Sequence, residues 1–208
     1  MSASLELADY SRGDVVYLLG ISHSFQERTF RPFVDGGPDR DPSKSCRFEK
    51  YLEDVVKQIQ PRVIGEESDD SILRGIQSID SNAYSVAKSV SERHNITHLY
   101  CDPNPSEREQ LYTEAGTNDA YDRENGYPVR EGEWLRRISP FLRARSLLFI
   151  CGATHVDSFK EKLEQEGVTV DVISRDLERE WNDACHDTAR SSTVAGRSPI
   201  DRASVILP

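Results

Sequence analysis

The feature that most constrains the fold is a pair of stretches, far apart in the chain, that share one design. The stretches "VVYLLGISHS" at 15–24 and "LLFICGATHV" at 147–156 are each an apolar run that ends in Gly, two further residues and His. A short, nearly continuous apolar run is typical of a strand buried on both faces, as in a parallel sheet covered by helices. The repeated design therefore predicts two buried strands, each followed by a histidine.

Segments with strand and helix character alternate along the rest of the chain. Further strands are expected at 62–65, 96–101 and 168–173. Apolar residues at helical spacing predict helices at 48–59, 81–94, 130–142, 157–165 and 177–189, while 106–121 is ambiguous and has a helical first half. Pro61 and Gly167 stop two of these helices, and Pro140 argues for a kink or an early end in a third. The alternation predicts an α/β fold with a mainly parallel central sheet flanked by helices.

The length of 208 residues suits one domain, with a core at about 13–175 and an extended tail at 190–208. The segment 27–46 is rich in Pro, Gly, Asp and Ser and is long for a connection, and its role is left open.

Residues 1–11 lack a signal-peptide pattern, and no apolar run is long enough for a membrane span. The four cysteines show no CxxC spacing. We therefore expect a cytoplasmic protein without a membrane partner.

The net charge of the chain indicates which classes of partner it can bind. A formal net charge of −10 and a pI of about 5.0 argue against nucleic-acid binding, because proteins that bind the phosphate backbone usually carry a basic surface. A small-molecule or peptide substrate is expected instead. We also expect a homodimer, a common state of small α/β enzymes.

Chemically useful side chains follow four of the expected strands. His23 follows the first, Glu66 and Glu67 the second, Asp102 the third and His155 the fourth. The carboxyl ends of parallel strands meet at one edge of the sheet, where ligands bind in open α/β folds. We therefore expect these residues to converge on one site.

Two chemistries remain open for such a set. Two imidazoles and one or two carboxylates suit a divalent metal such as manganese, cobalt, zinc or iron, with His23, His155, Glu67 and Asp102 as the ligands. Without a metal, one histidine would act as a general base, a carboxylate would orient it, and an arginine would stabilise a developing oxyanion.

Five segments together resemble the TraB/Tiki superfamily, which is distantly similar to the erythromycin esterase and ChaN-like proteins. These segments are "GISH" (20–23), "QPRVIGEES" (60–68), "YCDPNPSER" (100–108), "VREGEWLRRI" (129–138) and "GATH" (152–155). The resemblance spans 15–174 and rests on two GxxH motifs with acidic and arginine elements between them.

The resemblance implies an α/β fold and a hydrolase of amide or ester bonds. Tiki-like relatives use metal-dependent peptidase chemistry, whereas erythromycin-esterase-like relatives activate water with a histidine. Carried onto this sequence, His23 and His155 are the ligand or base pair, Glu67 or Glu66 is the acid of the second strand, and Arg130 contacts the oxyanion or a substrate carboxylate. The extended segment 35–45 after the first motif departs from the family and implies a different pocket.

Some of these residues also have a structural explanation. Glu66 or Glu67 could cap a helix near Ser71, and Asp102 before a proline could form an Asx turn. Two other functions compete with a hydrolase. One is a non-catalytic protein of the TraB-like fold that binds a small ligand or regulates, and the other is a toxin or defence component that acts through a partner.

Overall fold

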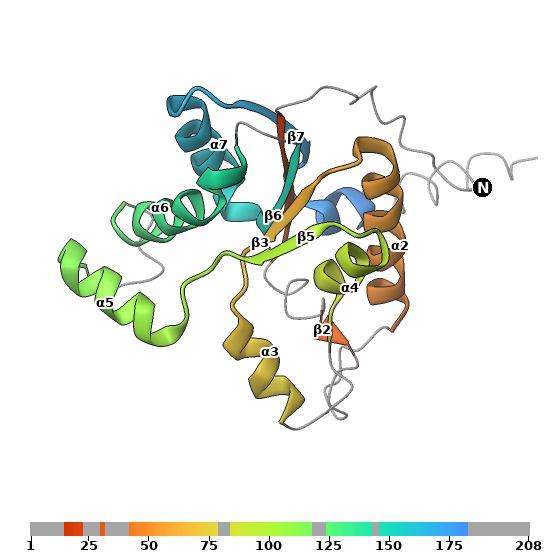
Figure 1. Cartoon of the computed structure of the whole chain (residues 1–208), viewed down its shortest axis with the longest axis horizontal. Coiled ribbons are helices and arrows are strands. Elements are labelled where there is room, and N and C mark those ends of the chain that lie inside the picture. The colour runs from red at the N-terminus through yellow and green to blue at the C-terminus, as the bar shows by residue number, and fades with distance from the viewer. Residues whose placement is uncertain are drawn as a thin grey trace, which may run out of the picture.

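The computed structural model describes residues 15–22, 30–31, 42–78, 84–117, 124–142 and 146–182. Five parallel strands form one sheet in the order β5-β3-β6-β1-β7 (Figure 1). They are β1 (Val15–Ile21), β3 (Val63–Glu66), β5 (Thr97–Tyr100), β6 (Leu147–Gly152) and β7 (Thr169–Ser174). The predicted α/β fold with a parallel central sheet is confirmed.

Helices cover both faces of this sheet (Figure 1). The helices α2 (Pro42–Ile59) and α4 (Val86–Arg93) contribute to one apolar cluster, and α6 (Gly126–Ile138) and α7 (Val156–Gln165) contribute to a second cluster on the opposite face. The remaining elements are α3 (Asp70–Gln77), α5 (Pro105–Ala115), the antiparallel pair β2 (Phe30–Arg31) and β4 (Tyr84–Ser85), and the 3-10 turns η1 (Ser139–Phe141) and η2 (Ala153–His155). Residues 177–182 are also helical.

The strand β1 shows why the chain has nearly continuous apolar runs. Successive side chains of a strand point to opposite faces, so Tyr17 and Leu19 pack toward α2 and α4, while Val16 and Leu18 pack toward α6 and α7. All seven residues of β1 are buried. A strand buried on both faces needs apolar residues at every position, which accounts for the first of the two repeated stretches.

The two repeated stretches lie side by side, because β1 and β6 are neighbours in the sheet. Gly20 pairs with Cys151, and Ile21 pairs with Gly152, so both Gly-x-x-His motifs begin at the carboxyl end of the sheet. A Cβ atom on Gly20 would lie 2.1 Å from the carbonyl oxygen of Arg175 and 2.6 Å from Cγ2 of Val156. Gly20 is therefore required by the close approach of the chain that follows β7.

Several predicted boundaries shift for identifiable reasons. The helix expected at 130–142 ends at Ile138, where η1 with Pro140 begins, so the predicted early end is confirmed. The helix expected from 81 begins only at Val86, because Tyr84 and Ser85 pair with β2 and Ser85 caps α4. The first half of the ambiguous segment 106–121 lies in α5, which Asn104 opens with a capping box and Gly116 ends in a left-handed conformation.

Among the helices of the described segments, none combines the length and the apolar character that crossing a membrane requires. Several predicted features fall outside these segments: His23, most of the loop at 27–46, the end of the helix expected at 177–189, and the tail at 190–208.

Candidate functional site

The carboxyl end of β3 sends two adjacent glutamates to opposite faces of the sheet. Glu66 shares a face with Ile64, and its Oε1 accepts a hydrogen bond from Ser85 Oγ at 2.9 Å and lies 3.0 Å from His98 Nε2. Glu67 points to the other face, where its Oε1 is bound by Arg130 at 2.7 Å. The alternation of side chains along a strand forces this separation. The two glutamates therefore belong to different polar clusters.

Arg130, on α6, joins the ends of β3 and β5. Its Nη2 contacts Glu67, and its Nε donates to Oδ1 of Asp102 at 3.0 Å. Trp134 Nε1 donates to the same oxygen at 2.9 Å, and Arg108 pairs with the other carboxylate oxygen. Burial alone would lower the pKa of Arg130, but the Glu67 and Asp102 carboxylates raise that pKa above its usual value. The guanidinium is therefore a permanent cation between two carboxylates.

Arg130 also keeps one donor group uncommitted. Its Nε and Nη2 make the hydrogen bonds to Asp102 and Glu67, whereas Nη1 makes none with the described residues. The side chain is 9% exposed, so Nη1 is a donor in a largely dry environment, where a bond to an anionic atom is stronger than in water.

His155 lies at the end of β6, in the turn η2, and its side chain is completely buried. Its Nδ1 lies 2.9 Å from Oε1 of Glu131, which also accepts a hydrogen bond from Ser158 Oγ at 2.6 Å. A carboxylate only accepts, so the hydrogen-bond network assigns a proton to Nδ1, and in the neutral imidazole Nε2 then carries the lone pair. Nε2 makes no hydrogen bond to the described residues and lies 3.8 Å from Oε1 of Glu67.

Aromatic rings and one backbone amide complete this site. The centroid of the Tyr127 ring lies 3.9 Å from that of the His155 ring, and the two ring planes are tilted by 35°. The centroid of the Trp134 ring lies 4.9 Å from that of His155. The amide of Gly152 donates to Oε2 of Glu67 at 2.6 Å, so the glycine of the second GxxH motif holds the carboxylate directly. We call Glu67, Asp102, Arg130, Glu131 and His155 the carboxyl-edge cluster.

The structure thus brings together Glu67, Asp102, Arg130 and His155 among the residues expected at the site. It places Glu66 on the opposite face with His98, and His23 lies beyond the described residues. His94 is the C-cap of α4.

Glu131, Trp134 and Arg108 also contribute to this site, although none of them was among the expected site residues. For Glu131 and Trp134 the sequence signal was a stripe on α6, because residues 127, 130, 131 and 134 follow the i, i+3, i+4, i+7 spacing of one helix face. Arg108 lies on α5 and has no such signal. Two charged residues on the buried face of an amphipathic helix indicate a buried polar site.

The thiols near the site are unsuited to nucleophilic catalysis. Cys101 and Cys151 are free and fully buried, and burial raises the pKa of each thiol above its ordinary value. A cysteine nucleophile needs thiolate character and partial exposure, and neither thiol meets these conditions.

The donor groups of the cluster can be compared with the expected metal ligands. Asp102 is committed to two arginines and a tryptophan, and both oxygens of Glu67 already accept hydrogen bonds. Only Nε2 of His155 is uncommitted among these three residues. Within the described segments, no group of three or more His, Cys, Asp or Glu side chains could hold a metal ion. The described donors do not fit a metal by themselves, and a site that includes His23 stays a prediction.

Comparisons with protein-family models, with curated proteins and with solved structures found no match to this chain.

Proposed function

We propose that this protein is a hydrolase of amide or ester bonds in which His155 activates water. The observation that carries the proposal is the state of the imidazole: Glu131 holds Nδ1, while Nε2 is unpartnered among the described residues and faces Glu67. A buried acceptor without a partner is costly to maintain, and such groups concentrate at functional sites. A carboxylate on the far nitrogen is also the usual device that fixes the tautomer of a working histidine.

In the proposed reaction, Nε2 of His155 takes a proton from a water molecule as the water oxygen attacks the substrate carbonyl carbon. A tetrahedral intermediate with a negatively charged oxygen forms, and the imidazole becomes an imidazolium. The Glu131 carboxylate stabilises that positive charge through Nδ1. The imidazolium then returns the proton to the leaving alcohol or amine as the bond to carbon breaks, which yields a carboxylic acid and restores the enzyme.

Arg130 is the candidate for stabilising the oxyanion. It is cationic, buried and rigidly held by Glu67 and Asp102, and its Nη1 makes no hydrogen bond with the described residues. A donor fixed in advance needs little reorganisation when negative charge develops on the substrate, which is how electrostatic catalysis is most effective. Because His155 is fully buried, a neighbouring side chain must move before a substrate reaches it, and we expect this to be Tyr127, which stacks on the imidazole.

The complete burial of His155 also supports a second candidate function, a non-catalytic protein that binds a small ligand. Each carboxylate of the cluster is paired, as in a network that fixes a core rather than performing chemistry. Fold alone does not choose between the two functions.

A screen of p-nitrophenyl esters and aminoacyl p-nitroanilides distinguishes the two functions. A hydrolase releases p-nitrophenol or p-nitroaniline above the buffer rate with at least one member of the panel. No release from any member by a protein with an intact circular dichroism spectrum would contradict the hydrolase. Ligand titrations with the same compounds would then test the binding protein.

A further inference from the structure

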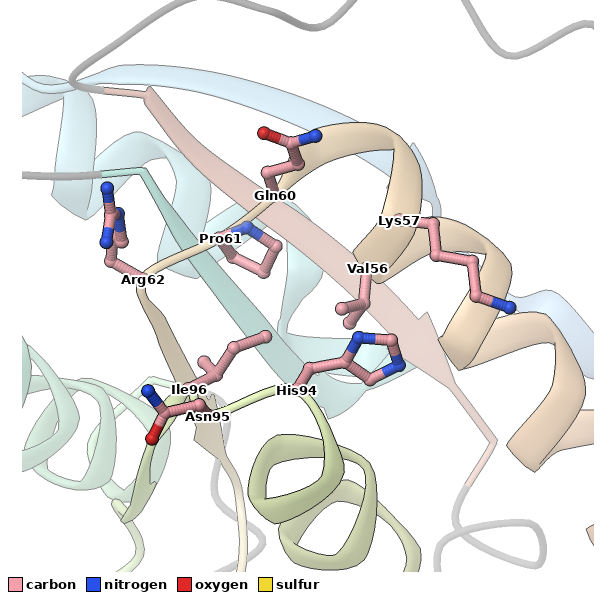
Figure 2. Close-up of a pocket in the computed structure, with 8 residues that line it drawn as sticks. All are labelled: Val56, Lys57, Gln60, Pro61, Arg62, His94, Asn95 and Ile96. Carbon is pink, nitrogen blue, oxygen red and sulfur yellow. The ribbon is translucent and has the colours of Figure 1, made fainter.

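A surface pocket of about 370 Å³ opens at the amino end of the sheet, at the opposite end of β3 from the carboxyl-edge cluster (Figure 2). It forms where α2 leads into β3 and where α4 leads into β5. Its walls come from two short segments, 56–62 and 94–96. The lining residues are Val56, Lys57, Gln60, Pro61, Arg62, His94, Asn95 and Ile96.

Basic groups gather at this pocket although the chain as a whole carries a net charge of −10. The side chains of Arg62 and His94 make no hydrogen bond or ion pair in the described segments. Lys57 approaches Glu53 and Asp54 only at 3.9 Å, beyond hydrogen-bonding distance. Figure 2 shows the His94 ring extending toward Val56 and Lys57, with Arg62 on the other side of the pocket. Among the described residues, Arg62 is therefore an unpaired cation on one side of the pocket, and Lys57 and His94 supply further nitrogen atoms on the other side.

Amide side chains and an apolar surface complete the lining. Gln60 and Asn95 end the turns after α2 and α4 with φ values of 47° and 55°, a conformation in which glycine is the usual residue. Each therefore adds a side-chain amide where a glycine would add nothing. Val56 and Pro61 are buried, and Ile96 packs against the same apolar cluster. Ile96, which is half-buried, therefore supplies most of the accessible apolar surface in a lining that is mainly polar.

We propose that this pocket binds a small organic anion that joins one carboxylate to an apolar body, such as an aromatic carboxylate. The apolar body would lie against Val56, Pro61 and Ile96, and the carboxylate would meet Arg62, with Lys57 and His94 nearby. The carboxyl ends of α2 and α4 add partial negative charge at this place, which disfavours a multiply charged anion such as a polyphosphate. A single carboxylate meets less of that repulsion than a multiply charged anion does and can still pair with Arg62.

Benzoate is the probe for this proposal, and calorimetric titration of the full chain is the measurement. Benzamide, which is neutral, and acetate, which lacks the apolar body, are the comparison ligands. We expect saturable benzoate binding and weaker binding of both comparison ligands. Arg62→Gln should weaken benzoate binding by about fivefold, as expected for the loss of one partly solvated ion pair.

Arg74→Gln is the matched control, because Arg74 is an exposed arginine on α3 that pairs with Asp70 and does not line the pocket. It should leave benzoate affinity unchanged. The proposal is overturned if benzoate gives no saturable heat, if benzamide binds as tightly as benzoate, or if Arg62→Gln and Arg74→Gln bind benzoate equally well. The carboxyl-edge cluster and its proposed chemistry are independent of all three results.

Discussion

Nε2 of His155 lies 3.8 Å from Oε1 of Glu67, although the two residues come from distant parts of the chain. They follow β6 and β3, which are neighbours in the sheet, and Gly152 of the second GxxH motif donates its amide to Glu67. The same sheet end carries a second histidine–carboxylate pair, His98 with Glu66, on the opposite face. This arrangement supplies an internal comparison for the role of His155.

Glu131 is expected to act as a positioning residue for His155. Glu131→Gln keeps the shape of the side chain but removes the negative charge that would stabilise the imidazolium. We expect kcat to fall about 10²-fold or more, with a much smaller change in KM, because the charge matters in the transition state. Steady-state kinetics on the best substrate of the screen is the measurement. A change in KM with kcat preserved would count against this role.

Alanine substitutions at Gly20 and Gly75 test the close packing at the carboxyl end of the sheet, with Gly75 as the uncrowded control. Gly20→Ala places a Cβ against the backbone of Arg175. We therefore expect the free energy of unfolding to fall by about 1–3 kcal/mol. Gly75, in α3, has no atom within 4 Å of its Cβ position, so Gly75→Ala should stabilise by about 0.5–1 kcal/mol through helix propensity. Urea denaturation measures both, and equal effects would refute the close approach at Gly20.

Glu133 makes stability depend on pH. Its hydrogen bonds from Arg136 and Arg137 hold the pKa of this carboxyl below its ordinary value. A lowered folded-state pKa gives stability that is present above the unfolded pKa of about 4.3 and is lost as pH falls through the folded value. Glu133→Gln should therefore destabilise the protein at pH 7 and have much less effect near pH 3. An undiminished difference at low pH would argue against these ion pairs as its source.

Removal of metal by a chelator distinguishes metal-dependent hydrolysis from hydrolysis with a histidine base, the two chemistries that the sequence left open. Nε2 of His155 is the uncommitted donor of the carboxyl-edge cluster, and Glu67 and Asp102 are held by arginines. We therefore expect hydrolysis to continue after dialysis against EDTA. Elemental analysis of the dialysed protein verifies removal of metal. Activity that disappears with the metal and returns with manganese, cobalt, zinc or iron would favour a site that includes His23.

The apolar runs and their glycines were sufficient to predict the sheet, because a strand buried on both faces leaves a continuous apolar signature. The choice between Glu66 and Glu67 depended on which face of the sheet each side chain meets. A shift of one residue in the register of β3 exchanges the two faces. Composition and spacing left this register open. The role of Glu131 depended on the rotation of α6 about its own axis, which tertiary packing sets.

The most direct test of the central claim compares His155→Gln with His98→Gln on the same substrate. Both remove an imidazole that is hydrogen-bonded to a glutamate at the same end of the sheet, but only His155 belongs to the carboxyl-edge cluster. The account predicts that His155→Gln lowers kcat/KM by about 10²–10⁴-fold, while His98→Gln keeps most of the activity. Circular dichroism and urea denaturation check that both variants are folded. Equal activities of the two folded variants would contradict His155 as the base.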